Sequence, residues 1–330
     1  MKLLKLIPDD TNISFLKWRN IAFGISTLLM IASLALLFGK GLNFGVDFIG
    51  GQMIRTTFTQ DKVAPVTKLR TEVAKLGYGD PTIQRFGNEN QVSIRLKLPV
   101  GADKKPELAN AMAEKIIAKL KADYPGIRID GTDSVSGKVS GELFSKGILA
   151  LGAAILGVSA FIWLRFEWQF GVGAVWALVH DVTLSLGLFA LTGLEFDLNI
   201  IAALLTIIGY SLNDTIVVYD RIRENLKKYR KMDMAALLDL SVNETLSRTM
   251  MTSLMVLIPL TVLDVFGPDV IFGFSLAMTF GIFVGTYSSV YMAAPILIWL
   301  KVGPDSFVPD DEAAAIKKEE RLKEGYGAKV

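Results

Sequence analysis

The sequence contains no cysteine and a single histidine, His180. The absence of cysteine excludes disulfides, thiol nucleophiles and cysteine-bound metals. The net charge is only +2 at pH 7, which is too small to indicate a nucleic-acid partner. Apolar residues, by contrast, are abundant: they make up 51% of the chain, and the mean hydropathy is +0.42. They form runs of about 20 residues, a length typical of membrane-spanning helices.

The apolar runs predict six membrane spans, at 20–38, 143–164, 169–191, 198–219, 249–265 and 270–300. The first run follows Lys2, Lys5, Lys17 and Arg19, so a signal peptide is an alternative interpretation. The run is long for the apolar core of a signal peptide, and no A-x-A cleavage pattern follows it. We therefore expect a retained anchor.

Basic residues predict the orientation, because they gather on the cytoplasmic side of a membrane. Segment 220–248 is rich in lysine and arginine. The short loops 192–197 and 264–269 contain no lysine or arginine, and all of their charged residues are acidic. We expect a multi-pass membrane protein whose two termini both lie in the cytoplasm. The expected cytoplasmic parts are residues 1–19, a basic loop at 220–248 and a charged tail at 301–330, and the expected outer part is 42–141.

The outer segment has the pattern of an α+β domain. Residues 52–59, 82–86 and 91–98 alternate as strands, and a last strand starts at 127. Two helices are expected from apolar residues at helical spacing: Val66, Leu69, Val73 and Leu76 in the first, and Leu108, Met112, Ile116 and Leu120 in the second. The order β-α-β-β-α-β predicts a ferredoxin-like fold. The segment shows no metal cluster, phosphate loop or nucleophile triad, so we expect no cofactor, metal or enzymatic activity.

Asp214 is the most informative residue, because it lies within the fourth span. An aspartate at the centre of a membrane helix costs roughly 2.5 to 3.5 kcal/mol even on lenient insertion scales. His180 and Asp181 lie within the third span. Ionisable groups in adjacent spans indicate a proton or ion path across the membrane.

Small residues recur every four positions in the sixth span, at Gly273, Ala277, Gly281, Gly285 and Ser289. Such a stripe lets another helix approach closely. The other helix belongs either to this chain or to a partner subunit. Pro259 and Pro295 predict kinks in the last two spans.

Four motifs resemble the SecF family, whose members form the smaller subunit of the bacterial SecDF accessory translocon. They are FGVDFIGG at 44–51, AALLTIIGYSLNDT at 202–215, VVYDRIREN at 217–225 and NETLSRT at 243–249. Their order and spacing extend the resemblance from about residue 15 to residue 300, and the tails show no match. Asp47 and the glycines of the first motif are expected to shape the backbone before the first strand.

The resemblance implies half of a resistance-nodulation-division (RND) transporter, with six spans and one outer domain. The other half would be a SecD-like subunit, and the pair would work beside the SecYEG channel, in contact with translocating preproteins and membrane lipids. It implies that proton flow helps to pull preproteins out of the channel at a late stage. It also implies that Asp214 and Arg248 conduct the protons.

The residues themselves leave alternatives open. Asp214 could be a packing residue bonded to its neighbours, and Arg248 could be an anchor on the cytoplasmic side. His180 and Asp181 could form a satisfied polar pair, and only one of them is expected to face Asp214 because adjacent helical residues point about 100° apart.

Two other functions are also possible. A pair of carboxylates, Asp181 and Asp214, would suit an intramembrane aspartyl protease, but Asp214 follows Ser-Leu-Asn and not the G-x-G of that type. A passive scaffold that stabilises the translocon is the other alternative.

Overall fold

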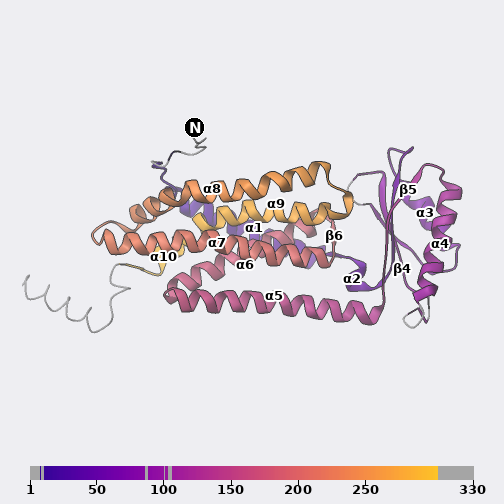
Figure 1. The fold of residues 1–330 in the computed structure, drawn as a ribbon, viewed down its shortest axis with the longest axis horizontal. Helices are drawn as coiled ribbons and strands as arrows, with labels where there is room; N and C mark the ends of the chain where they lie inside the picture. Colours follow the sequence, from indigo (N-terminus) through magenta and orange to yellow (C-terminus); the bar gives the residue numbers. More distant parts are fainter. Residues whose placement is uncertain (1–7, 9–10, 86–87, 100, 103–105, 304–330) are drawn as a thin grey trace, which may run out of the picture.

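The structure, a computed structural model, describes residues 8, 11–85, 88–99, 101–102 and 106–303. It is elongated, with a bundle of long helices at one end and a small sheet domain at the other (Figure 1). The helical bundle itself has two ends. We call the end that carries the basic connection 229–233 the basic end, and the end next to the sheet domain the domain end.

Six helical segments of the described chain are long and apolar enough to cross a membrane. They are η1 (Leu16–Trp18) with α1 (Arg19–Gly39); α5 (Gly137–Arg165); α6 (Trp168–Thr192); α7 (Leu198–Lys228); α8 (Met234–Phe266); and α9 (Asp269–Ser288), which continues through a π-helical turn, η2 (Ser289–Ala293), into α10 (Ala294–Trp299). All six predicted spans are therefore present as helices.

The segment 220–248 differs from the expected loop. It is helical except at 229–233, because α7 continues to Lys228 and α8 already begins at Met234. No glycine or proline interrupts either stretch, and Asp233 caps α8 by accepting hydrogen bonds from the backbone N–H groups of Ala235 and Ala236. Hydropathy marks where a helix leaves an apolar layer, which is not where the helix ends.

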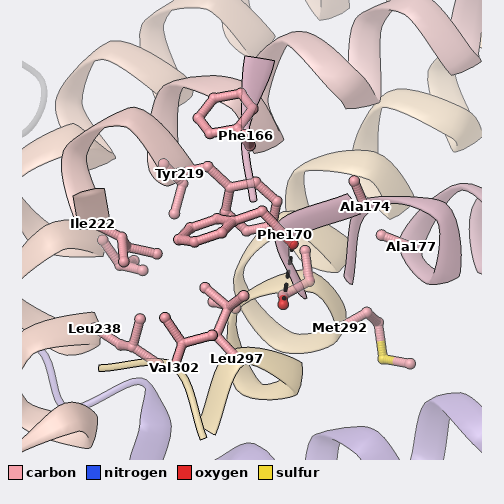
Figure 2. Packing of buried hydrophobic residues seen from close by; sticks show 14 of the residues in the cluster. Phe166, Phe170, Ala174, Ala177, Tyr219, Ile222, Leu238, Met292, Leu297 and Val302 are labelled. Atoms are coloured by element: carbon pink, nitrogen blue, oxygen red, sulfur yellow. Dashed lines mark hydrogen bonds between the residues drawn. The ribbon is translucent and has the colours of Figure 1, made fainter. Parts of the chain in front are cut away.

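The helices α6 and α7 form the centre of the bundle. Their most apolar windows are 56% buried, compared with 11% for α5 and 17% for α1 and α8. Near the basic end, Phe166 and Phe170 pack against Tyr219 of α7, whose hydroxyl donates to the carbonyl of Ala293 at 3.3 Å (Figure 2). The central helices thus have their environment fixed by protein, whereas the outer ones expose apolar faces.

The sheet domain has the predicted ferredoxin-like order. It comprises β2 (Gly51–Phe58), α3 (Val66–Ala74), β3 (Thr82–Arg85), β4 (Gln91–Leu96), α4 (Pro106–Asp123) and β5 (Ile127–Val135). The sheet order is β3-β4-β2-β5, and all neighbours are antiparallel. Helices α3 and α4 lie on one side of the sheet (Figure 1), over a core that includes Ile54, Leu69 and Ile116.

The predicted end of one strand was wrong, and one residue of the second predicted helix is less buried than its neighbours. Leu98 lies outside β4, which ends at Leu96, because Pro99 follows and cannot donate a ladder hydrogen bond. Leu108 is 40% exposed, whereas Met112 is buried. A row of residues spaced by four drifts about 40° per step around a helix, so the end of the row turns away from the core.

A junction that the sequence did not predict joins the domain to the bundle. The strand β1 (Asn43–Phe44) pairs in parallel with β6 (Glu195–Phe196), which lies between α6 and α7. A short helix, α2 (Val46–Ile49), follows β1, and its Asp47 accepts a hydrogen bond from the N–H of Leu198 at the start of α7. Gly51 has a φ of 121°, and an added Cβ would lie 2.5 Å from the carbonyl oxygen of Leu96.

A buried ion pair lies at this junction. Arg95 of β4 approaches Glu195 of β6 at 3.7 Å. Burial raises the pKa of Glu195, and the charge of Arg95 offsets part of this rise. The ion pair thus links the sheet domain to the segment that leads directly into α7.

Candidate functional site

Asp181 is the centre of a buried polar cluster between three helices. It lies on α6 and is 1% exposed. Its Oδ2 accepts hydrogen bonds from Ser211 of α7 at 2.5 Å and from Ser288 of α9 at 2.9 Å. Its Oδ1 lies 2.9 Å from Nδ1 of His180. Both carboxylate oxygens are therefore engaged, and the cluster ties α6, α7 and α9 together.

His180 is fully buried and uses only one of its two ring nitrogens. Nδ1 faces Asp181, whereas Nε2 has no hydrogen-bond partner within the described parts of the chain. The ring lies 6.3 Å from the ring of Tyr287, whose hydroxyl donates to the carbonyl of Ala22 on α1. The two neighbouring residues thus bond to each other, and neither hydrogen-bonds to Asp214 in the described structure.

Asp214 is 2% exposed on α7, and its Oδ2 has no hydrogen-bond partner among the described residues. The neighbours that would make it a bonded packing residue are directed elsewhere. Ser211 donates to Asp181, Asn213 is exposed, and the hydroxyl of Tyr210 also lacks a partner. A buried carboxylate oxygen without a partner is uncommon and calls for an explanation beyond packing.

Arg248 lies opposite Asp214 on α8. Asp214 is 14 residues before the end of α7 at Lys228 (228 − 214), and Arg248 is 14 residues after the start of α8 at Met234 (248 − 234). Because these two ends meet at one short turn, both residues lie at a similar height, roughly 21 Å from it at 1.5 Å per residue. Arg248 acts electrostatically on Asp214, yet among the described side chains no ion pair within 4 Å joins them.

Further polar side chains, which the sequence analysis did not single out, lie at a similar height in the bundle. Thr249, next to Arg248, is 4% exposed, and its hydroxyl lacks a partner in the described part of the chain. Thr215 of α7 bonds to Ser289 at 3.0 Å. Ser289 is the first residue of the π-helical turn η2 that follows α9. The signal in the sequence was the recurrence of serine and threonine inside apolar spans.

The small-residue stripe packs against α7 of the same chain. A Cβ at Gly281 would collide with the side chain of Ile207, and one at Gly285 would lie 2.9 Å from the Cβ of Ser211. Ala277 is fully buried, and Gly273 lies beside Ile200. Of the two expected partners for the stripe, the structure therefore provides the helix within this chain. The stripe brings Ser288 and Ser289 to their partners.

Comparison with known proteins identifies the family. The profile described as "Protein export membrane protein SecD/SecF, C-terminal" matches residues 115–303, and the profile "SecD/SecF GG Motif" matches 35–62. The "Protein translocase subunit SecF" of Cereibacter sphaeroides is 47% identical over 305 residues, which is 91% of this chain and 93% of that protein. The chain belongs to the SecF family. The SecF subunit of Rickettsia rickettsii is 40% identical, over 89% of this chain and 94% of the relative.

Solved structures agree with the SecF assignment. SecDF of Thermus thermophilus, described as a translocon-associated membrane protein, superposes with a TM-score of 0.78 at 33% identity over 90% of this chain. A second SecDF structure, in a super-membrane-facing form, gives a TM-score of 0.61 at 30% identity over 95% of the chain. In both cases the chain spans 40% of the SecDF chain.

The family, the six helices and the sheet domain confirm the predicted fold class. The chain is a multi-pass protein of the inner membrane and a translocase subunit of the SecF type, which is a transport component and not an enzyme.

Proposed function

We propose that this SecF-family chain, together with a SecD-like subunit, uses the proton gradient to assist late preprotein translocation beside the SecYEG channel. The SecD-like partner is inferred from the SecDF structures, in which the region similar to this chain makes up 40% of a longer polypeptide. The bundle also exposes apolar faces on α1, α5 and α8, which a partner subunit and membrane lipids would cover.

The observation that carries the proposal is the state of Asp214. A buried carboxylate must be paired, protonated or in contact with water. Oδ2 of Asp214 has no hydrogen-bond partner among the described residues. The side chain of Arg248 is exposed and does not come within the 4 Å of Asp214 that an ion pair requires. A guanidinium that moves toward Asp214 would stabilise its carboxylate, and withdrawal would favour the protonated acid. Relative movement of α7 and α8 would thereby load and release a proton.

The energy available to this switch is that of the membrane field. Each proton that crosses delivers roughly 2.3 kcal/mol per 100 mV. This is comparable to the roughly 2.5 to 3.5 kcal/mol needed to hold a charged aspartate at the centre of a membrane helix. One proton per cycle would thus supply free energy of the same order as the difference between the two states of Asp214.

The second polar cluster would have a different part. Asp181 already accepts bonds from two serines and faces His180, so we assign it the role of holding α6, α7 and α9 in place. His180 retains one ring nitrogen, Nε2, through which a proton could pass, since an imidazole can take up and release protons.

The orientation is proposed from the basic end. Exposed tryptophans gather there, as is typical of a membrane–water interface: Trp18, Trp163, Trp168 and Trp299. Beyond these tryptophans, the end of α7 carries Lys227 and Lys228, and the connection to α8 carries Arg230 and Lys231. We therefore place the basic end, with both termini, in the cytoplasm and the sheet domain outside.

Two alternatives compete with this proposal. An aspartyl protease would need Asp181 and Asp214 to share a proton, but Asp181 is bonded to Ser211, Ser288 and His180 instead. A passive scaffold would give no reason for a buried carboxylate oxygen without a partner at the same height as Arg248 on the neighbouring helix. The proton-driven function accounts for both features.

The test is late-stage export into vesicles that contain this chain, a SecD-like subunit and SecYEG, with and without an imposed proton gradient. Asp214→Asn keeps the size of the side chain but cannot titrate, so the gradient-dependent part of export should be lost while insertion stays normal. Arg248→Met should have the same effect, and Asn213→Ala, an exposed neighbour, is the matched control. A native response from Asp214→Asn would refute the proposal.

A further inference from the structure

Residues 11–16 lie against the half of α8 nearest the basic end, in a contact that shares no residue with the site described above. Asn243 of α8 binds both backbone groups of Ile13: Oδ1 accepts from its N–H at 2.9 Å, and Nδ2 donates to its carbonyl at 2.8 Å. One helical turn earlier, Asp239 accepts from the N–H of Leu16 at 2.8 Å. We call residues 11–16 together with Asp239 and Asn243 the N-terminal clamp.

The clamp provides the helix cap that the start of α1 lacks. Neither Phe15, before η1, nor Trp18, before α1, makes a side-chain cap hydrogen bond. The first N–H groups of a helix need an acceptor, and a carboxylate is favoured there by the helix dipole. Asp239 meets this need from 223 positions away in the sequence.

Apolar packing reinforces the clamp. Leu16 is 2% exposed and belongs to the core cluster that also contains Leu238 and Val242 of α8. Figure 2 shows Leu238 within this cluster, near the basic end of the bundle. The contact therefore buries Leu16 and Asn243, whereas Ile13 remains 48% exposed.

The position of the clamp relates it to Arg248. Arg248 follows Asn243 by five residues on α8, a rise of about 7.5 Å. The helix α1 packs on α6, whereas α8 packs on α7 and α9. Of the hydrogen bonds in the described structure, those that link residues 11–39 to α8 all belong to the clamp. The clamp thus ties α8, just before Arg248, to the α1–α6 side of the bundle.

We propose that the N-terminal clamp positions Arg248 for the proton step, by fixing the height and rotation at which α8 presents the guanidinium to Asp214. The inference rests on the proposed function of Asp214. Asn243 and Asp239 make no hydrogen bond to Asp214 or Arg248 in the described structure, so they are positioning residues that act through α8. Only 17% of the apolar window of α8 is buried, so polar ties contribute to holding its register. Ser241 and Glu244 bind side chains of α7, and the clamp adds the tie to the side of α1.

The first measurement reports on α8 itself and does not depend on proton transport. Because the chain has no cysteine, Thr249→Cys introduces a single thiol next to Arg248 at a position that is 4% exposed. Its labelling by a small maleimide is followed in the full chain with its SecD-like partner in vesicles. Adding Asn243→Leu should speed labelling roughly tenfold, the effect expected from losing hydrogen bonds to a buried group.

A second variant perturbs the clamp from its other side. Ile13→Pro removes the backbone N–H that donates a hydrogen bond to Oδ1 of Asn243, and it leaves the sequence of α8 unchanged. It should speed labelling as Asn243→Leu does. Asn12→Ala, an exposed change in the same stretch, is the matched control and should leave the rate unchanged. In chains without the reporter cysteine, both clamp variants should lower gradient-driven export several-fold at native insertion levels.

The outcomes separate the clamp from the proposed function. If Asp214→Asn stops gradient-driven export but the clamp variants export as the native chain does, the positioning role is wrong. Unchanged labelling in both clamp variants would equally overturn it, since α8 would then be held by other contacts. If Asp214→Asn itself responds normally to the gradient, the proton function fails, and the labelling rates alone decide whether the clamp holds α8.

Discussion

The close contact between α9 and α7 leads to a sharp prediction for Gly285. An alanine there would place its Cβ 2.9 Å from the Cβ of Ser211 and 3.3 Å from its Cα. Ordinary contacts between such atoms start near 3.4 Å, and a backbone atom cannot rotate away as a side-chain tip can. The two helices must therefore separate, and Ser211 must shift while it donates to Asp181.

The expected cost follows from the chemistry of overpacking. Inserting one methyl into a tightly packed interface costs about 1 to 3 kcal/mol. Such a loss corresponds to a fall in Tm on the order of 5 °C. Gly157→Ala on α5 is the matched control, because its Cβ would meet nothing within 4 Å, and alanine favours the helix.

The assay is thermal unfolding of the purified chain in detergent, with each variant measured beside the native protein. Gly285→Ala should unfold at a lower temperature, whereas Gly157→Ala should match or exceed the native Tm. Equal Tm values for the two variants would show that the α7–α9 contact is not as tight as the structure has it. The small-residue stripe would then not set the position of Ser288.

Three further predictions follow from other parts of the structure. Asp181→Ala leaves the hydroxyls of Ser211 and Ser288 without their acceptor, so Tm should fall by more than for Gly285→Ala, in the same unfolding assay. Burial raises the pKa of Glu195 above its usual 4.5, so the folded state binds the proton of this carboxyl more tightly than the unfolded state does. The free energy of unfolding should therefore fall as pH rises from 4.5 through the raised pKa of Glu195. Glu195→Gln should flatten that pH dependence; an unchanged profile would assign it to other groups. Reporter fusions should be active in the cytoplasm at positions 230 and 320 and in the periplasm at 90 and 195, and a cytoplasmic signal at 90 would reverse the orientation.

The sequence predicted the parts of the fold that depend on local patterns. Runs of apolar residues gave six helices, and strand alternation around Ile54 and Ile94 gave the order of the sheet domain. Both signals arise because each element must bury one face or fill an apolar layer. The same signals could not find the ends of α7 and α8, since helices continue in water when no residue breaks them.

The junction between β1 and β6 lay outside the reach of sequence patterns. Each strand has two residues, and their pairing joins Asn43 to Glu195 across 152 positions (195 − 43). The glycines and the aspartate of the neighbouring FGVDFIGG motif predict only a particular backbone shape before the first strand. The hydrogen bond from Leu198 to Asp47 shows that this aspartate also caps α7.

The candidate site was only partly predictable. Residue type and depth pointed to Asp214, His180 and Asp181, because an ionisable group in a membrane helix is costly wherever it lies. Helical geometry alone could not reveal that Asp181 bonds to its neighbour His180, nor that Ser288 binds Asp181 while Ser289 binds Thr215. These contacts depend on how helices pack, which no single segment determines.

The central claim is that Asp214 carries a proton, and proton flux across a sealed membrane tests it most directly. Vesicles holding this chain and its SecD-like partner are loaded with a pH-sensitive dye, and a gradient is imposed. The account predicts proton entry with the native chain and with Asn213→Ala, and none above the lipid background with Asp214→Asn. Equal flux through the native chain and Asp214→Asn would contradict the account.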